Sequence, residues 1–203
     1  MRLILASASP RRQQLLRAAG INFEVQATDL PEVPQQGESP RQFAERMAQE
    51  KARAILSPPK GVRYFVLAAD TVVTVDGQIL GKPQDAEDAR RMLRLLSGRE
   101  HQVITGVCLT AVNPLPGPWP ASHLFDFTED VRSELTRVWV NEISEDEILA
   151  YVASGEPMDK AGAYAIQGVA SRWIPRIEGC YFNVVGLPVP LVSRMLREHG
   201  AWQ

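Results

Sequence analysis

The sequence is poor in the residues that build disulfide frameworks and transition-metal sites. Its 203 residues include only 2 cysteines, Cys108 and Cys180, and 3 histidines. None of them forms a Cys-x-x-Cys motif or a Cys/His cluster with the spacing of a zinc site. We therefore expect two reduced, mostly buried thiols and no Cys/His metal centre.

The sequence also lacks an excess of positive charge and a long hydrophobic run. Its 22 Lys and Arg residues against 24 Asp and Glu residues give a formal net charge of -2. Non-specific binding to nucleic acid or to an anionic membrane needs a basic excess, so we expect neither partner. The apolar segment 3–6 is too short for a signal peptide or a membrane span. These absences predict a cytoplasmic protein.

Several nucleotide-binding and hydrolase signatures are missing as well. The sequence contains no Walker loop and no Gly-x-Gly-x-x-Gly motif. A serine hydrolase is not expected, because no Gly-x-Ser-x-Gly elbow is present. Any phosphate site must therefore be built from other elements, and a small anion needs only a local cluster of cations.

The residues that are present are typical of a globular α/β protein. Hydrophobic residues make up 45% and charged residues 23% of a chain long enough for one large domain or two small lobes. We expect one compact unit, 1–203, in which strands and helices alternate around a mixed sheet. The predicted strands are 3–6, 21–25, 64–69, 71–75, 78–80, 103–109 and 135–140; the helices begin near Ser9, Ser39, Asp85, Ser144 and Pro190.

One segment resists this pattern. Residues 113–120 alternate prolines with other residues, and prolines cannot join a central sheet. The segment predicts a projecting loop or an irregular hairpin tip. The favoured interpretation is a variable surface loop, and the alternative is a partner-binding role.

The first candidate site is the turn between the first strand and the first helix. Ser7 is followed by Ser9, a helix N-cap candidate, and by Arg11 and Arg12 in the first helical turn. Free backbone N–H groups and the positive end of the helix dipole make such a turn an anion site. Two arginines fit poorly at that end of a helix unless they bind phosphates as forked donors. The alternative is that both reach solvent.

The other candidate residues have less specific local patterns when each is considered alone. Asp70 ends an apolar strand, where catalytic carboxylates often lie, and Thr71 follows it. Lys82 follows a hairpin, Lys51 lies within a helix, and Glu32 lies in a loop between prolines. Each has an ordinary structural explanation: a turn residue, a surface lysine, a solvated helix face or a stiff loop.

Segment 159–168 is the last candidate for the binding site. Its closely placed glycines suggest close backbone approach, and its Gln167 can hydrogen-bond a base edge. A tight turn packed on the core is the alternative for that segment. Taken together, the candidates supply cations for a polyphosphate, carboxylates for a metal and a base for water, as phosphoryl chemistry requires.

An ordered set of motifs resembles the Maf family of nucleotide pyrophosphatases and spans nearly the whole chain. The motifs are 5–12 (LASASPRR), 50–52 (EKA), 68–73 (AADTVV), 81–83 (GKP), 96–98 (LSG), 101–106 (HQVITG) and 185–188 (VGLP). The resemblance implies an inosine-triphosphate-pyrophosphatase-like fold, with a mixed twisted sheet, flanking helices and two lobes around a central cleft. It also implies a homodimer. The main departure is a Pro-rich insertion near 113–130, which leaves partners and oligomer geometry open.

The resemblance also implies an activity and roles for individual residues. The implied reaction is cleavage of a nucleoside triphosphate to monophosphate and pyrophosphate, and segment 159–168 resembles the branch that acts on dTTP and UTP rather than 7-methyl-GTP. By position, Asp70 matches the general base. The residues Arg11, Thr71 and Gln167 match those linked to base choice, and Ser7, Arg12, Glu32, Lys51 and Lys82 match the cleft lining. The segment around Glu32, Leu-Pro-Glu-Val-Pro, departs from the more acidic loop that is typical of the family.

The predicted mechanism uses a divalent cation, Mg²⁺ or Mn²⁺, held by Asp70, Glu32 and the triphosphate. Three alternatives remain open. One is a 7-methyl-GTP pyrophosphatase of the same family. A non-catalytic nucleotide-binding regulator of cell division would bind nucleotide without turnover, and a nucleotidyl transferase would need an acceptor pocket that the sequence does not reveal.

Overall fold

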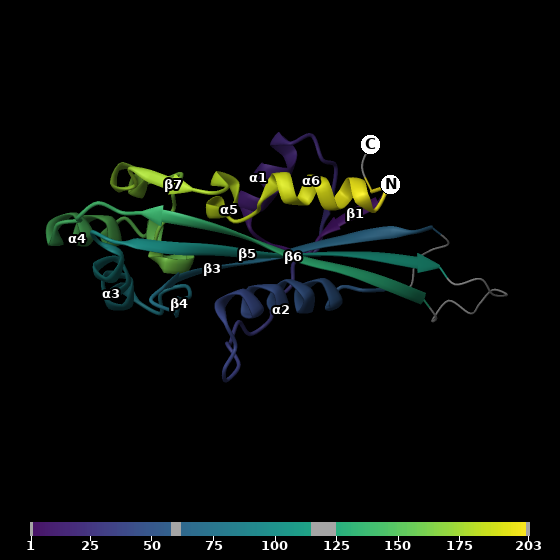
Figure 1. Cartoon of the computed structure of the whole chain (residues 1–203), viewed down its shortest axis with the longest axis horizontal. Coiled ribbons are helices and arrows are strands. Elements are labelled where there is room, and N and C mark those ends of the chain that lie inside the picture. Colours follow the sequence, from purple (N-terminus) through teal and green to yellow (C-terminus); the bar gives the residue numbers. More distant parts are fainter. Residues whose placement is uncertain (1, 58–61, 115–124, 202–203) are drawn as a thin grey trace.

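The computed structural model describes residues 2–57, 62–114 and 125–201, which form a mixed sheet flanked by helices (Figure 1). The strands are β1 Arg2–Leu5, β2 Glu24–Val25, β3 Tyr64–Val75, β4 Gln78–Leu80, β5 Glu100–Pro114, β6 Phe125–Trp139 and β7 Arg176–Glu178. The α-helices are α1 Pro10–Ala18, α2 Pro40–Arg53, α3 Ala86–Leu96, α4 Glu145–Ala153, α5 Tyr181–Val185 and α6 Val189–Glu198. Three short 3₁₀ turns follow α4: η1 Glu156–Asp159, η2 Ala161–Ala163 and η3 Val169–Trp173.

The sheet has parallel and antiparallel parts, which confirms the predicted α/β class. Its strand order is β2-β1-β3-β5-β6-β7, with β4 paired to the far end of β3. β1 pairs in parallel with β2 and β3, and the remaining pairs are antiparallel. Along one side of β3, β1 pairs with residues 64–67 and β4 pairs with 73–75. Residues 68–72 lie in the gap between these two neighbours, so the sheet is open on that side.

The predicted end of a strand at Asp70 is wrong. β3 continues from Tyr64 to Val75, and Asp70 lies in its middle, paired with Gly106 of β5. The prediction ended the strand at Asp70 because the apolar run ends there. Backbone pairing with β5 nevertheless continues on both sides of Asp70. The opening beside Asp70 comes from the change of neighbour on the other side of β3, not from a strand end.

The hairpin of β5 and β6 is longer than predicted. Each strand has 15 residues, in register from Glu100↔Trp139 to Pro114↔Phe125. The prediction followed apolar runs, whereas the first part of β6 is polar and is held by backbone pairing to β5. Residues 113–114 and 125–130 therefore belong to strands, with the proline at a strand end, where it is tolerated. The remainder of the Pro-rich segment, 115–124, lies outside the described residues.

The helix starts follow their capping signals. Ser39 with Gln42 and Ser144 with Glu147 form complete capping boxes, and the side chain of Asp85 accepts the Asp88 N–H. The predicted strand 21–25 is reduced to two residues, and the short elements β7 and α5 were not predicted. Among the described residues, no helix is both long and apolar enough to cross a membrane.

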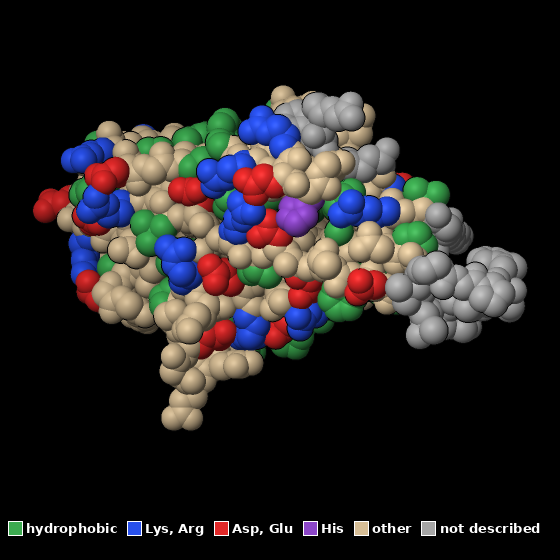
Figure 2. All heavy atoms as spheres, turned by 45° about the vertical axis from the view of Figure 1, so that its right-hand side comes forward, with side chains coloured by type: hydrophobic (Ala, Val, Ile, Leu, Met, Phe, Trp, Pro, Cys, Tyr) green, Lys and Arg blue, Asp and Glu red, His purple; other side chains and the backbone are tan. Residues whose placement is uncertain are grey.

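The helices cover both faces of the sheet. Figure 1 shows α2 on one face, α1, α5 and α6 on the other, and α3 and α4 beside one end. Side chains of β1 alternate accordingly: Leu3 and Leu5 join the large core cluster, while Ile4 and Ala6 join the cluster under α2. Figure 2 shows basic and acidic side chains interspersed over one face, in keeping with a net charge near zero.

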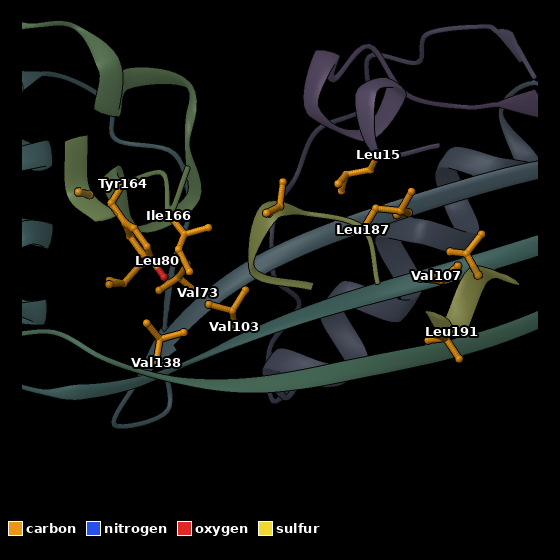
Figure 3. Close-up of a cluster of buried hydrophobic side chains, with 14 of the residues drawn as sticks. Leu15, Val73, Leu80, Val103, Val107, Val138, Tyr164, Ile166, Leu187 and Leu191 are labelled. Atoms are coloured by element: carbon orange, nitrogen blue, oxygen red, sulfur yellow. The ribbon is translucent and has the colours of Figure 1, made fainter. Parts of the chain in front are cut away.

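The large core has two groups of side chains along the sheet (Figure 3). Tyr164, Ile166 and Leu80 gather at one end, and Leu187 and Leu191 lie at the other. All are buried, so each end of the sheet has its own packed helices and turns. Both groups belong to one cluster of buried side chains, of which the figure draws a part.

A glycine lets α2 approach the sheet closely. A Cβ on Gly106 would lie 2.2 Å from the backbone oxygen of Ala44 in α2, which no other residue type permits. Because Gly106 pairs with Asp70, the same close approach sets α2 beside that carboxylate. The thiols behave as predicted: Cys108 is buried, Cys180 is partly buried, and both are free.

Candidate active site

All the predicted site residues line one cleft of about 350 Å³. They come from the β1–α1 turn, the loop before α2, α2 itself, β3, the segment after β4 and the turn after η2. The set is Ser7, Arg11, Arg12, Glu32, Lys51, Asp70, Thr71, Lys82 and Gln167. The cleft also includes Tyr164 and Ile166 from one core group and Val185 and Gly186 from the other side. Segments from both ends of the chain therefore meet around one cavity.

The Arg12 guanidinium is held in place by uncharged acceptors. Its Nε donates to the Gly186 carbonyl at 2.8 Å, Nη1 to Ser7 Oγ at 3.2 Å and Nη2 to Thr71 Oγ1 at 3.1 Å. Burial lowers the pKa of Arg12, while the charges of Asp70 and Glu32 raise it, and a guanidinium remains protonated. Two of its five N–H groups are left over, one on each terminal nitrogen. This is a fixed, forked cation that faces an anion-sized cavity.

Arg11 differs from Arg12 although they are adjacent in sequence. Its Nη1 forms an ion pair with Asp159 of η1 at 3.3 Å, and the Asp159 side chain is largely exposed. Both residues line the cleft. The pair therefore connects the first turn of α1 to the end of η1 beside the cleft. Ser9, the predicted N-cap, occupies the cap position without a side-chain cap bond; its N–H instead donates to Ser7 Oγ.

Lys51 joins the two predicted carboxylates. Its Nζ lies 2.5 Å from Asp70 Oδ1 and 2.7 Å from Glu32 Oε1. Lys82 Nζ reaches the other oxygen of Glu32 at 3.2 Å. Lys51 is only 7% exposed and Asp70 only 5%. The floor of the cleft is thus a row of alternating charges, and only its outer end, Lys82, is well exposed.

The charges of this row are stabilised by one another. Burial raises the pKa of Glu32, but its bonds and charge interactions with Lys51 and Lys82 lower it more, so its pKa lies below the ordinary value. The two members of the buried Asp70–Lys51 pair differ in what each loses without the other: removal of Lys51 leaves the buried Asp70 carboxylate without its cation, whereas removal of Asp70 leaves Lys51 paired with Glu32. Glu32 is therefore held ionised and presents its negative charge to a cationic ligand.

The carboxylates fit a divalent cation held jointly with phosphates. Asp70 and Glu32 contact the same ammonium group, so their oxygens lie close together. The described residues include no group of three or more His, Cys, Asp or Glu side chains that could hold a metal by themselves. Mg²⁺ typically binds through one or two carboxylates, several waters and substrate phosphates, and this site offers the two carboxylates.

The opposite wall is formed by the turn that carries Gln167. A Cβ on Gly162 would lie 2.9 Å from Val73, and its N–H donates to the Gly81 carbonyl, so this turn packs tightly on β3 and the segment after β4. At Gly162 the structure has the alternative named for this segment, a tight turn packed on the core, and Gln167 of the same segment lines the cleft. The Tyr164 hydroxyl is paired with His101 Nε2 at 2.7 Å. Burial lowers the pKa of His101 to about 4, so the imidazole is neutral at pH 7.

Several residues of the site were not predicted. Tyr164 and Asp159 line the cleft and lie in the candidate segment 159–168, but neither was given a role by itself. Thr105 and Asn183, which lie behind Thr71, were not among the candidates. Thr105 lies in a motif that pointed to the family, but no local pattern assigns it a role. Its neighbours in space come from β3 and α5, and only the tertiary structure brings them together.

Comparisons with known proteins match nearly the whole sequence to one family. The family model described as Maf-like protein matches residues 2–199. A Koribacter versatilis protein named dTTP/UTP pyrophosphatase is 52% identical over 200 residues, covering 98% of this chain and 95% of that protein. Proteins of the same name from Syntrophomonas wolfei and Geobacter sulfurreducens are each 48% identical, covering 97% and 98% of this chain and 96% and 97% of those proteins.

The solved structure of the Staphylococcus aureus Ham1 protein is a more distant likeness, with 14% identity and a TM-score of 0.44 over 98% of this chain and 100% of that one. A score of that size supports no inference. The full-length sequence matches do, and they agree with the motifs that line the cleft. This chain belongs to the Maf family.

Proposed function

We propose that this protein hydrolyses dTTP and UTP to the nucleoside monophosphate and pyrophosphate. The observation that carries the proposal is the row Asp70–Lys51–Glu32–Lys82 beside the fixed cation Arg12, all in one cleft. The substrates follow from the names of the full-length relatives at about half identity. Modified pyrimidine triphosphates belong to the same substrate class.

Asp70 is the general base in this proposal. It accepts a proton from the water that attacks the α-phosphorus, the bond from that phosphorus to the bridging oxygen breaks, and pyrophosphate leaves. Lys51 binds Oδ1 of Asp70, and the described residues supply no hydrogen bond to Oδ2, so Oδ2 is the oxygen that takes the proton. Asp70 lies in the part of β3 between the segments that pair with β1 and β4, and this gap allows a substrate to reach its carboxylate.

The cations of the cleft neutralise the charge of the leaving group. Arg12 presents its two unused N–H groups, while Lys51 and Lys82 supply point charges from the other side. Such a contact contributes about 3 kcal/mol to a transition state in which charge develops on oxygen. Mg²⁺ or Mn²⁺ at Asp70 and Glu32 would supply further neutralisation of the phosphate oxygens when bound.

Base choice is assigned to the residues on either side of the phosphate site. Arg11, Thr71 and Gln167 line the cleft together, with Ser7 beside Arg12. Gln167 carries an amide that can both donate to and accept from the imide edge of uracil or thymine. We also infer a single Maf-like domain, a homodimer and a cytoplasmic location, as expected from the sequence.

The test is pyrophosphate release from a panel of dTTP, UTP, CTP, GTP, 7-methyl-GTP and 5-methyl-UTP with Mg²⁺ or Mn²⁺. Wild type is compared with Asp70→Asn and with the control Asp76→Asn, which lies in the exposed β3–β4 turn where asparagine is well accepted. We expect turnover of dTTP and UTP that only Asp70→Asn abolishes. Turnover of 7-methyl-GTP instead would contradict the substrate assignment. Nucleotide binding without any turnover would point to a regulator.

A further inference from the structure

A buried chain of hydroxyl and amide groups lies directly behind the cleft. Thr71 on β3 and Thr105 on β5 are paired across the sheet, and their Oγ1 atoms are 2.9 Å apart. Thr105 Oγ1 donates to the backbone carbonyl of Asn183 in α5 at 3.2 Å. Thr105 and Asn183 are completely buried, whereas Thr71 lines the cleft. The chain therefore connects the cleft to the interior of the sheet.

The inner end of this chain is rigidly held. The side-chain amide of Asn183 donates to the Val103 carbonyl at 2.9 Å and to Thr136 Oγ1 at 3.0 Å. Thr136 Oγ1 in turn accepts from the N–H and donates to the carbonyl of Cys180. The Asn183 carbonyl that receives the Thr105 proton is thus fixed to β5, β6 and the start of α5.

Each hydrogen bond in this row of groups is donated from the cleft side toward the interior. Thr105 has a single proton, which it gives to Asn183, so it can only accept from Thr71. Thr71 has two acceptors within reach of its single proton, Thr105 Oγ1 at 2.9 Å and the Gly186 carbonyl at 3.3 Å. The shorter contact takes the proton, and Thr71 offers a lone pair to Arg12, whose Nη2 donates to it at 3.1 Å. The sequence of donors is Arg12, Thr71, Thr105 and the Asn183 carbonyl. Thr105 thereby decides that Thr71 is an acceptor toward the cleft.

Thr71 has a second acceptor, the Gly186 carbonyl, which would take its proton if the Thr105 hydroxyl were absent. The Gly186 carbonyl lies 3.3 Å from Thr71 Oγ1 and is also the acceptor for Arg12 Nε at 2.8 Å. A Thr71 hydroxyl that turned to Gly186 would compete with Arg12 for that oxygen. The Gly186 carbonyl would then be shared between two donors, and the lone pairs of Thr71 would turn relative to Arg12 Nη2. Two of the three bonds that orient the guanidinium would therefore change in geometry.

The buried hydroxyl of Thr105 has a desolvation cost that a valine at the same position would not have. The neighbours of Thr105 on β5 include Val103, Ile104 and Val107, all buried, and valine has nearly the same shape as threonine. A buried hydroxyl is unfavourable unless it is hydrogen-bonded, so the simplest core would carry valine here. We propose that Thr105 is a positioning residue, which holds Thr71 and through it Arg12 in the orientation that binds the substrate phosphates. The inference rests on the proposed function for the identity of that ligand.

The experiment measures the affinity for inorganic pyrophosphate, the proposed product, by calorimetry. Pyrophosphate carries no base and is not a substrate of the proposed reaction, so the readout depends only on the phosphate site. The variants are Thr105→Val, Thr105→Ser, Thr71→Val and the double variant Thr71→Val/Thr105→Val. The control is Thr110→Val, because Thr110 is an equally buried threonine of β5 whose hydroxyl contacts Cys108 rather than the cleft.

We expect Thr105→Val to weaken pyrophosphate binding about fivefold, the usual effect of one hydrogen bond. Thr105→Ser restores the hydroxyl and should bind within about twofold of wild type, as should Thr110→Val. Because Thr105 acts through Thr71, the double variant should bind no more weakly than Thr71→Val alone. Melting temperatures of all variants identify any that fail to fold, and Thr105→Ser keeps the test valid in that case.

Additive effects in the double variant would overturn the inference, because Thr105 would then act independently of Thr71. It would equally be overturned if Thr105→Val bound pyrophosphate like wild type, if serine failed to restore binding, or if wild type bound no pyrophosphate. A wild type that binds pyrophosphate with the expected pattern but turns over no nucleotide would instead contradict only the proposed function.

Discussion

At the scale of single residues, Lys51 is the centre of the site. It is a buried ammonium group between two carboxylates, and its two bonds to Asp70 and Glu32 offset the cost of its desolvation. Lys82 contacts the same Glu32 from an exposed position, where an ion pair contributes little to stability. The two lysines therefore differ in their structural role even though both can bind phosphate.

Substitution of Lys51 should separate these roles. Lys51→Met leaves Asp70 buried without its partner, so we expect a loss of roughly 3 kcal/mol in the free energy of unfolding along with loss of turnover. Lys82→Met is the matched control: turnover should fall by about a hundredfold with the unfolding free energy within about 0.5 kcal/mol of wild type. Urea denaturation and steady-state kinetics measure the two quantities. Equal stability of both variants would contradict the structural role of Lys51.

His101 should make stability depend on pH. Burial holds its pKa at about 4, below its ordinary 6.5, and its neighbour Tyr164 is neutral there. Between these values the unfolded chain binds a proton that the folded protein does not, so stability should fall as pH drops from 6.5 to about 4. The contribution of this residue is roughly 3 kcal/mol.

The measurement is urea unfolding of wild type and His101→Gln across that range. The glutamine does not titrate, so the variant should lose less stability than wild type on acidification. Parallel curves for the two proteins would show that the imidazole does not titrate in this way.

At the scale of elements, the packing of α2 on the sheet positions Lys51. The helix begins at a capping box and approaches β5 at Gly106, and these two features set where its later turns meet β3. Lys51 lies near the end of the helix, so its contact with Asp70 depends on the distance between helix and sheet. Local propensity forms the helix, and the glycine determines its depth.

Gly106→Ala should therefore impair both stability and activity. The new methyl group would lie 2.2 Å from the Ala44 carbonyl, so α2 must move outward. We expect a loss of roughly 3 kcal/mol and at least about tenfold lower turnover as Lys51 moves from Asp70. The stability control is Gly81→Ala, where a Cβ meets nothing within 4 Å. If both glycine variants unfolded at the same urea concentration, close packing at Gly106 would not matter.

At the scale of the whole molecule, the cleft is assembled from segments spread along the chain. The β1–α1 turn, α2, β3 and the turn bearing Gln167 meet only when the sheet is complete. The unfolded chain has no such arrangement. A ligand of the cleft must therefore stabilise the folded protein by mass action.

Thermal unfolding of Asp70→Asn with dTTP should test this linkage, because the variant is expected to bind substrate without consuming it. At a nucleotide concentration of about one hundred times the Kd, we expect about 2.7 kcal/mol of added stability and a clear rise in Tm. At the same nucleotide concentration, the rise should be smaller in Asp70→Asn/Gln167→Ala, which lacks the proposed base contact. An equal rise in both proteins would remove Gln167 from base recognition.

Features that depend on neighbours along the chain could be predicted from the amino-acid sequence. Capping boxes at Ser39 and Ser144, the Asp-Gly turn of β3 and β4, and the strand-to-helix turn before α1 all follow from local backbone chemistry. The ordered motifs identified the family and, through it, the candidate residues of the site. Those residues do line one cleft.

Strand lengths and the meeting of charges depended instead on the folded chain as a whole. The polar residues of β6 belong to the sheet because each has a backbone partner in β5. Asp70 lies within β3 rather than at its end because β3 pairs with β5 along nearly its whole length. The contacts of Lys51 with Asp70, and of Thr105 with Thr71, depend on strand register and on the depth of α2. Such contacts join residues distant in sequence, and no local pattern encodes the distance between them.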